Sequence, residues 1–419
     1  MTSPRAHTNQ RGLHIGYLIQ QFPPEVGAGP ARAAEMATRW VQAGARVSVV
    51  TAMPNRPKGR IYPEFRGHLY QHEEWNEILV HRTWVYASPK HGAARTVLNN
   101  LSFLGTSIVA GSKALHVDVL IASSPPFFPH LAGAFLHWAH RTPLVLEVRD
   151  LWPDYMAELG MVRGRTAAML FRLERWLMDR AAAVVVVTEP MRRRVIAKGV
   201  APDRVLVIPN GVDTAQYHAA PAPVPIPALE RKSDEFIVGY LGNFGASQRL
   251  DVVVEAAAKV AGDGGIRVVM AGDGTDRASV EAAIARWRPS NVTVAPGIAK
   301  IDTRAFYNAC DVCLVPLAPI DVLDDALPSK LFEIMACQVP VLGAVRGEAA
   351  RVIRAANAGY VAPPGDAQAL ASGMLTMRDW SSETRQAAGR SGRTFVEQYF
   401  ERERLAEEYL GHLLRVGER

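Results

Sequence analysis

The densest group of polar side chains in the sequence lies between residues 321 and 340, DVLDDALPSKLFEIMACQVP. Pro328 suits the first turn of a helix, and Ser329 and Lys330 would lie at the positive end of that helix. Glu333 would follow one turn later. In this geometry Lys330 could meet a diphosphate while Glu333 accepts hydrogen bonds from a ribose diol. The alternative is an ordinary solvated first turn of a helix.

Three glycine-containing loops, each following a predicted strand, are candidate anion-binding sites. Glycine lets backbone N–H groups approach a phosphate, and the N-terminus of the following helix adds about half a positive charge. The first of the three could equally be a tight strand-to-helix turn. In chain order the loops carry Gly27 and Gly29, then Gly242, Asn243 and Gly245, then Gly272 and Gly274.

Two common nucleotide-binding motifs are absent from the sequence. Arg32 stands where the G-x-G-x-x-G fingerprint that begins at Gly27 would need its third glycine. A nicotinamide-dependent oxidoreductase is therefore the least favoured class of enzyme. No G-x-x-x-x-G-K-[ST] segment occurs either, which argues against hydrolysis of ATP or GTP at a P-loop.

A second polar pair ends a predicted strand in the first half of the chain. Arg149 and Asp150 directly follow the apolar run 144–148, and the run Ser123 to Pro126 follows another strand. Charged groups at the carboxyl end of a buried parallel strand line the crevice in which α/β sheets bind ligands. Arg149 and Asp150 are thus candidates for the acceptor side of a site, although they could also form a structural ion pair.

The sequence predicts neither a metal nor a bound cofactor. Cys310 and Cys313 have the spacing of half a zinc knuckle, but no second pair or histidine cluster completes it, and a free cysteine at such a helix-to-strand junction behaves as a small core residue. An Asp-x-Asp motif, which could hold a divalent ion on a diphosphate, is missing. Phosphate charge would then be met by lysine, backbone N–H groups and helix dipoles.

Short β-branched runs alternate with longer amphipathic stretches along the whole chain, which predicts an α/β fold built on parallel sheets. Most of these runs are almost continuously hydrophobic, as expected for strands that are buried on both faces. Strands are predicted at residues 13–19, 46–51, 118–122, 144–148, 183–188 and 205–208, and again at 236–241, 266–271, 292–295, 312–315 and 339–343.

The length of 419 residues and a Pro/Ala-rich segment at 219–229 predict two domains. Residues 1–12 are polar, lack the apolar run of a secretory signal and are expected to be a disordered lead-in. The remaining boundaries are a first Rossmann-like domain at 13–208, a linker at 209–235, a second Rossmann-like domain at 236–382, and C-terminal helices at 383–419 that would pack across the domain junction.

Composition and charge indicate the cellular compartment and the kind of partner to expect. Hydrophobic residues make up 48% and charged residues 21%, as in an ordinary globular protein, and three cysteines suit a reducing compartment. This cysteine usage leads us to expect a cytoplasmic protein. No apolar run is long enough to span a membrane. Residues 1–205 hold 25 Lys and Arg against 15 Asp and Glu, whereas residues 206–419 hold 22 against 26. The basic first half would face a phosphorylated substrate or an anionic membrane surface; scattered basic residues without a recognisable module argue against nucleic acid.

Several motifs, taken together, resemble those of the family 4 retaining glycosyltransferases of the GT-B fold over nearly the whole chain. They are VIPNGVD ending at Asp213, AGDG at 271–274, ACDVCLVP at 309–316 and PSKLFEIMAC at 328–337. Further segments are similar to the bacterial envelope-polysaccharide branch of that family, which includes the WbuB-like and colanic acid transferases. These segments are FPPEVGAGPAR, VRDLWPD, YLGNFG and LPSKLFE.

The resemblance implies two doubly wound Rossmann-like domains facing a central cleft, with the donor bound mainly by the second. It maps the Glu-x7-Glu motif of the family onto Asp325, a shorter carboxylate, and Glu333, which would recognise ribose. Lys330, helped by Arg249 and the backbone of Gly242 to Gly245, would offset the diphosphate charge. Asp150 aligns with acceptor-side or catalytic residues. Catalysis would retain the anomeric configuration, with the donor phosphate helping to deprotonate the acceptor and no covalent intermediate.

The expected function is transfer of a hexosyl or N-acetylhexosaminyl group from a nucleoside diphosphate sugar, UDP favoured, to a lipid-linked oligosaccharide in cell-envelope polysaccharide synthesis. Basic and aromatic segments at 84–95 and 169–180 could attract the inner face of the plasma membrane, which would make the protein peripheral. Two alternatives remain open, namely a sugar-nucleotide epimerase with the same architecture and a non-catalytic sugar-nucleotide-binding protein.

Overall fold

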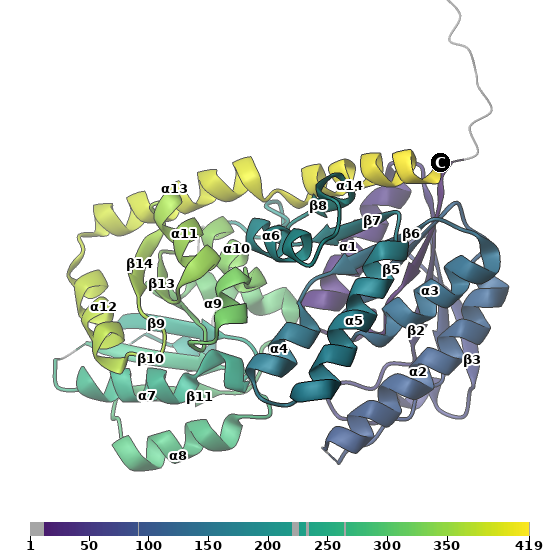
Figure 1. Cartoon of the computed structure of the whole chain (residues 1–419). Coiled ribbons are helices and arrows are strands. Elements are labelled where there is room, and N and C mark those ends of the chain that lie inside the picture. Colours follow the sequence, from purple (N-terminus) through teal and green to yellow (C-terminus); the bar gives the residue numbers. More distant parts are fainter. Residues whose placement is uncertain (1–11, 91, 220–225, 232–233, 264, 419) are drawn as a thin grey trace, which may run out of the picture. The chain divides into compact units, whose positions relative to one another are not determined.

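The computed structural model describes residues 12–90, 92–219, 226–231, 234–263 and 265–418, which form two α/β units (Figure 1). The first unit contains the described chain up to Val186, Arg194–Ile208 and the residues from Ala406 onward; the second contains Val187–Arg193 and Pro209–Leu405. The predicted lead-in, apart from Gly12, and the centre of the Pro/Ala-rich segment lie outside the described residues.

The first unit is built on an eight-stranded sheet in the order β3-β4-β2-β1-β5-β6-β7-β8, in which only the β3–β4 pair is antiparallel. Strand order reverses between β1 and β5, so the carboxyl ends of these two strands form the switch point at which such sheets bind ligands. Its strands are β1 (His14–Leu18), β2 (Arg46–Ala52), β3 (Tyr70–Trp75), β4 (Ile78–Thr83), β5 (Val119–Ser124), β6 (Leu144–Val148), β7 (Ala183–Val186) and β8 (Val205–Val207). Its helices are α1 (Ala28–Gln42), α2 (Ala93–Ala114), α3 (Phe128–His140), α4 (Trp152–Glu158) and α5 (Gly164–Arg180), while α6 (Glu189–Ala197) divides between the two units.

The hairpin β3–β4 was not predicted from the sequence, for a local reason. Its two turn residues, Asn76 and Glu77, both have positive φ, at 49° and 62°, which is the signature of a type I′ turn. The usual sequence marker for that turn is Asn-Gly, and here a glutamate occupies the second position. In addition, β3 reads YQHEEW and has little of the apolar character that identifies a strand.

The second unit has a six-stranded, fully parallel sheet in the order β11-β10-β9-β12-β13-β14. Its switch point lies between β9 and β12. The strands are β9 (Phe236–Leu241), β10 (Ile266–Ala271), β11 (Val292–Ala295), β12 (Val312–Pro316), β13 (Val341–Ala344) and β14 (Gly359–Ala362). The helices are α7 (Leu250–Lys259), α8 (Arg277–Trp287), α9 (Thr303–Asn308), α10 (Ser329–Ala336), α11 (Gly347–Ala355), α12 (Ala367–Asp379) and α13 (Ser382–Tyr399), and α14 (Arg402–Gly417) leads from this unit into the first.

Both faces of the second sheet are buried, as the continuous hydrophobicity of its strands predicts. Alternate residues of β9 illustrate this, because Ile237 packs in one core cluster while Val238 and Tyr240 pack in another. The three cysteines are free and buried, and all lie in the first of these clusters, which agrees with the core prediction for Cys310 and Cys313. The predicted α/β class, and every strand predicted for this unit, are confirmed within a few residues; β14 was missed.

The VIPNGVD segment anchors the chain where it enters the second unit. Val212 is fully buried, and its N–H donates to the carbonyl of Phe400 at 2.8 Å. Gly211 has φ 63°, and a Cβ there would lie 2.8 Å from the same carbonyl, so the close approach requires glycine. Arg402 donates to the Gly211 carbonyl at 2.6 Å. Among the described residues, no helix combines the length and hydropathy needed to cross a bilayer.

Candidate active site

The loops that follow β9 and β10 meet at the switch point of the second unit. Gly272 has φ 150°, and a Cβ on it would lie only 1.9 Å from the carbonyl oxygen of Gly242. A Cβ on Gly274 would lie 2.3 Å from the carbonyl oxygen of Phe244. No side chain fits in these spaces, so the glycines allow the two loops to pack backbone against backbone.

The amides of these loops, which the sequence interpretation offers as candidate diphosphate ligands, make hydrogen bonds within the protein. The N–H of Gly242 donates to the Ala271 carbonyl at 3.0 Å, and the N–H of Gly245 donates to the side chain of Gln248 at 3.2 Å. The amides of Gly272 and Gly274 are also bonded, to the Ala295 carbonyl at 3.2 Å and to the Asp273 side chain at 2.9 Å. In this structure these four N–H groups have hydrogen-bond partners within the second unit itself.

Lys330 brings an ammonium group to this switch point from the first turn of α10. Its Nζ lies 4.0 Å from the ring centroid of Tyr240, a cation–π contact, and a Cβ on Gly242 would lie 2.6 Å from Nζ. The phenol of Tyr240 is itself held, because it donates to the Asn243 carbonyl at 2.6 Å. Burial lowers the pKa of Lys330 to about 8, although the charge of Glu333 opposes the shift. Among the described residues, the Lys330 ammonium makes no hydrogen bond or ion pair, so its three donors remain available.

Glu333 lies one turn further along α10 and is fixed by two phenols. Tyr307 donates to its Oε2 at 2.9 Å, and Tyr217 donates a second hydrogen bond. Burial raises the pKa of Glu333, while these hydrogen bonds and the charges of Lys300 and Lys330 lower it. The result is an oriented, partly buried carboxylate beside an ammonium group, which is the pairing that a ribose and its diphosphate require.

The other residues predicted for the site in this unit differ in how many partners they already have. Arg249 forms a bidentate ion pair with Asp251, with both N–O distances at 2.9 Å, which reduces its capacity to bind phosphate. Asp325 ends a short 3-10 helix, η6 (Asp321–Asp325), and its carbonyl accepts from Thr188 at 2.8 Å. Ser329 is the first residue of α10, and Asn243 is exposed on the loop after β9.

In the first unit the structure brings together Gly29, Arg149 and the segment after β5. Arg149 donates from Nε to Ser123 Oγ at 3.2 Å and to the Ser124 carbonyl at 3.1 Å. A Cβ on Gly29 would lie 2.4 Å from a terminal nitrogen of Arg149, so this glycine makes room for the guanidinium. Gly27, predicted with Gly29 as a donor-binding residue, precedes α1. Asp150 is exposed and directly precedes the turn into α4.

A buried ion pair behind Arg149 was not predicted. Glu147, on β6, has no exposed surface and accepts from Arg32 at 3.0 Å, from Tyr17 at 2.7 Å and from Ser123 at 2.7 Å. Burial alone would raise the pKa of Glu147, but the charges of Arg32 and Arg149 and these hydrogen bonds lower it. Arg32, which stands where the fingerprint would need its third glycine, supplies the counter-ion of Glu147. Since 115 residues separate the pair, only the unusual glutamate in an apolar strand signals it in the sequence.

Two family descriptions match the chain, one for each unit. A "Glycosyl transferase 4-like domain" matches residues 27–211, and "Glycosyl transferases group 1" matches residues 226–395. Together they account for most of the sequence, including every candidate residue described above. The chain therefore belongs to the glycosyltransferases that join a 4-like first domain to a group 1 second domain.

Relatives and solved structures agree with this assignment. The putative colanic acid biosynthesis glycosyl transferase WcaI of Escherichia coli is 26% identical over 76% of this chain and 80% of its own length. The 2-deoxystreptamine glucosyltransferase of Streptomyces kanamyceticus is 29% identical over 48% of this chain and 52% of its own length. Anabaena HepE, solved in complex with UDP and glucose, has a TM-score of 0.72 at 18% identity, with 96% of this chain and 100% of that chain covered. Sucrose-phosphate synthase from Thermosynechococcus elongatus has a TM-score of 0.74 at 18% identity and covers 96% and 98%. The predicted GT-B class of two Rossmann-like domains is confirmed.

Proposed function

We propose that this chain is a retaining glycosyltransferase that uses a nucleoside diphosphate sugar, with UDP as the favoured nucleotide. The observation that carries the proposal is the available ammonium of Lys330 beside the oriented carboxylate of Glu333 at a sheet switch point. Diphosphate departure creates the largest charge of the reaction, and a preorganised cation stabilises that charge most in a partly buried site. The solved complex of HepE with UDP and glucose supports the choice of nucleotide.

The proposed roles follow from the donor and acceptor properties of each group. Lys330 would donate to the β-phosphate, and the cation–π contact of its ammonium group with Tyr240 limits the entropy lost on binding. Glu333 would accept from the ribose hydroxyls while Tyr307 holds its other side. Asp325 would lie near the donor sugar, as the family motif implies. No metal takes part in this scheme, because Lys330 supplies the positive charge.

Retention of configuration would proceed on one face of the donor sugar. The bond from the anomeric carbon to the diphosphate breaks, and a phosphate oxygen accepts the proton of the acceptor hydroxyl as the new glycosidic bond forms. This route needs no enzymatic nucleophile. Asp150, exposed at the carboxyl end of β6, would orient the acceptor, while Arg149 holds the neighbouring loop after β5.

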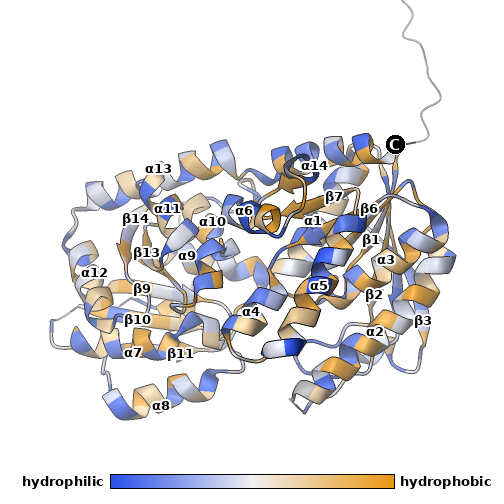
Figure 2. Cartoon of the chain, in the orientation of Figure 1, coloured by the Kyte–Doolittle hydropathy of each residue, from blue (hydrophilic) through white to orange (hydrophobic). Residues whose placement is uncertain are grey.

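The proposed acceptor is a lipid-linked oligosaccharide of cell-envelope polysaccharide synthesis, used at the cytoplasmic face of the membrane. Helix α2, which carries many hydrophobic residues (Figure 2), supports a peripheral contact, because several of them are exposed on its outer face. The most exposed is Val109, at 60%. The others are Val97, Leu98 and Leu101. Basic residues of the same half of the chain would add attraction to anionic lipid.

Co-sedimentation with phosphatidylcholine vesicles should increase when phosphatidylglycerol is added. Equal sedimentation with and without phosphatidylglycerol would contradict the proposed contact with an anionic membrane.

The donor half of the proposal is tested by thermal-shift measurements against UDP-, GDP-, ADP- and TDP-sugars. A nucleotide that binds only the folded chain raises the unfolding midpoint by mass action, and the UDP series should give the largest increase. Turnover without any acceptor would instead favour the epimerase alternative. Binding without transfer or hydrolysis would favour the non-catalytic alternative.

A further inference from the structure

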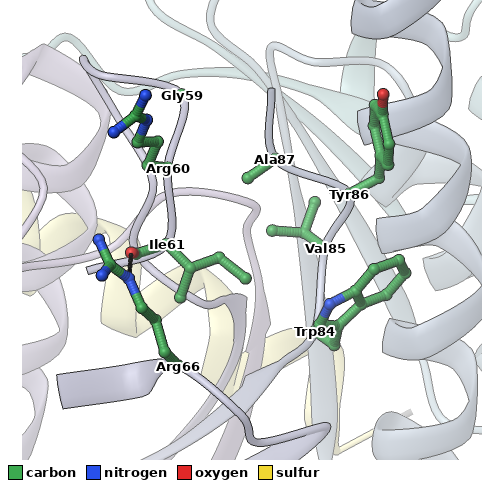
Figure 3. Close-up of a pocket in the computed structure, with 8 residues that line it drawn as sticks. All are labelled: Gly59, Arg60, Ile61, Arg66, Trp84, Val85, Tyr86 and Ala87. Atoms are coloured by element: carbon green, nitrogen blue, oxygen red, sulfur yellow. Dashed lines mark hydrogen bonds between the residues drawn. The ribbon is translucent and has the colours of Figure 1, made fainter. Parts of the chain in front are cut away.

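A pocket in the first unit lies apart from the candidate active-site residues. It opens between the loop that follows β2 and the segment that follows β4, and its volume is about 370 Å³ (Figure 3). Small-molecule sites in proteins occupy roughly 300–1,000 Å³, so the pocket is large enough to hold a ligand. Its principal lining residues are Arg60, Ile61, Arg66, Trp84, Val85 and Tyr86.

The two walls of this pocket are held in place before any ligand arrives. Gly59 has φ 61°, and a Cβ on it would lie 2.1 Å from the carbonyl oxygen of Ser88, so the walls meet where only glycine fits. On one wall, the N–H of Tyr62 donates to the Pro54 carbonyl at 2.9 Å. On the other, the N–H of Tyr86 donates to a serine of α2, Ser102, at 2.8 Å. A ligand would therefore meet a largely preorganised site.

The lining combines an apolar centre with positive charge at one side. In Figure 3 the side chain of Ile61 extends into the space toward Val85, the indole of Trp84 lies beside Val85, and both guanidinium groups lie on the side of Ile61. Arg66 is oriented by a hydrogen bond from Nε to the Ile61 carbonyl at 2.9 Å, which leaves its terminal nitrogens to other partners.

The loop that forms the Ile61 wall is strongly basic, and the charge on this wall is not neutralised. Among the described residues, no hydrogen bond or ion pair involves the Arg60 guanidinium. Residues 56–66, RPKGRIYPEFR, contain four basic side chains and a single acid, Glu64. Such a wall selects an anionic ligand.

We propose that this pocket binds a phosphorylated saccharide. The apolar face of a sugar ring would pack on the Trp84 indole, and its phosphate would accept hydrogen bonds from Arg60 and Arg66, whose planar guanidinium groups match phosphate oxygens. If the chain is the glycosyltransferase proposed above, this ligand belongs to the acceptor, and that assignment rests on the proposed function. The binding itself does not depend on it.

The test compares glucose 1-phosphate with glucose by isothermal titration calorimetry, without and with saturating UDP to occupy the Lys330 region. The wild-type chain should bind glucose 1-phosphate at least tenfold more tightly than glucose. The double variant Arg60→Ala/Arg66→Ala should lose at least tenfold in that affinity and keep its affinity for UDP. A matched variant, Arg165→Ala/Arg172→Ala, removes two exposed arginines of the same unit and should change the affinity less than twofold.

Equal affinities for glucose and glucose 1-phosphate, or equal losses in the two double variants, would overturn the proposal. A chain that binds glucose 1-phosphate through Arg60 and Arg66 but does not bind UDP would refute the proposed function and leave the pocket assignment standing. A second arm measures retention on phosphatidylcholine vesicles that contain undecaprenyl diphosphate-linked N-acetylglucosamine. Retention that falls in the Arg60→Ala/Arg66→Ala variant identifies a lipid-linked source of the phosphate; unchanged retention identifies a free sugar phosphate.

Discussion

Each unit places a basic side chain beside a glycine turn at its sheet switch point, but the two basic groups have different surroundings. In the first unit Arg149 donates to Ser123 and to two main-chain carbonyls, at distances of 3.1–3.2 Å. In the second unit Lys330 has an aromatic ring at 4.0 Å and a carboxylate one turn away, without a direct ion pair. Arg149 is committed to holding the loop after β5, whereas Lys330 retains donors for a ligand.

A buried ion pair in the first unit differs from Lys330 in the same way. Glu147 and Arg32 are both almost completely buried, and their charges are satisfied by each other and by neighbouring hydroxyl groups. A buried charge that is fully paired has a structural role, because a ligand would have to displace its partners. A partly buried charge with open donors marks a place where a ligand completes the pairing. We therefore expect stability effects at the Arg32–Glu147 pair and binding effects at Lys330 and Glu333.

The largest effect is expected for Arg32→Ala, which leaves Glu147 buried without its counter-ion. Removing one partner of a buried pair typically costs about 3–5 kcal/mol in the free energy of unfolding. Urea unfolding followed by circular dichroism measures this change. The double variant Arg32→Met/Glu147→Gln should recover a large part of the loss, because no unpaired charge remains; a double variant as unstable as Arg32→Ala would contradict the ion-pair explanation.

Lys330→Ala should reduce transfer by a factor of about 10²–10³ in kcat/KM, the usual loss when one preorganised group that stabilises developing negative charge is removed. Release of the nucleoside diphosphate, measured by a coupled assay, reports this value. The free energy of unfolding should change little, since Lys330 makes no ion pair that would be broken. Activity within threefold of wild type would place the diphosphate elsewhere.

Glu333→Gln should weaken UDP binding about tenfold, because a hydrogen bond to a charged acceptor contributes roughly 1.5–3 kcal/mol. The sharper measurement is a comparison of UDP with 2′-deoxy-UDP by calorimetry. Loss of the 2′-hydroxyl should cost affinity in the wild-type chain and much less in the variant. Equal costs in both proteins would show that Glu333 does not contact that hydroxyl. Tyr307→Phe, which removes the phenol that orients Glu333, should give an intermediate result.

The smallest predicted effect is a pH dependence of UDP affinity. The pKa of Lys330 is lowered to about 8 in the free protein, and a bound diphosphate would raise it. Below pH 8 the ammonium is already charged; above pH 8 binding must first take up a proton, so affinity should fall by at most about tenfold for each pH unit. Lys330→Arg keeps its charge and should bind UDP equally well from pH 7 to 9. A parallel decline in both proteins would assign the titration to another group.

Much of the fold follows from local sequence, whereas the details of the candidate site do not. The strands of the second unit are continuous apolar runs, and their prediction needs only their neighbours along the chain. The partners of Glu333 come from far away in sequence: Tyr307 is 26 residues distant, and Tyr217 lies in another part of the unit altogether. No local pattern places these phenols against one carboxylate.

The glycine loops show how a correct motif can receive an incomplete explanation. The sequence marks Gly242, Gly272 and Gly274 as candidates because they follow strands, and it predicts that their amides meet a phosphate. The structure shows instead that the two loops pack so closely that side chains are excluded and the amides are bonded within the protein. Glycine would be needed at these positions both for phosphate binding and for close packing of the loops. Only the hydrogen-bond partners of the amides distinguish the two explanations.

The most direct measurement of the central claim is a crystal structure of the chain with UDP. We predict that Lys330 Nζ lies within about 3 Å of a diphosphate oxygen and that Glu333 accepts from the ribose hydroxyls. A complex in which the diphosphate binds elsewhere, with Lys330 still stacked on Tyr240 and Glu333 in contact only with the phenols, would contradict it.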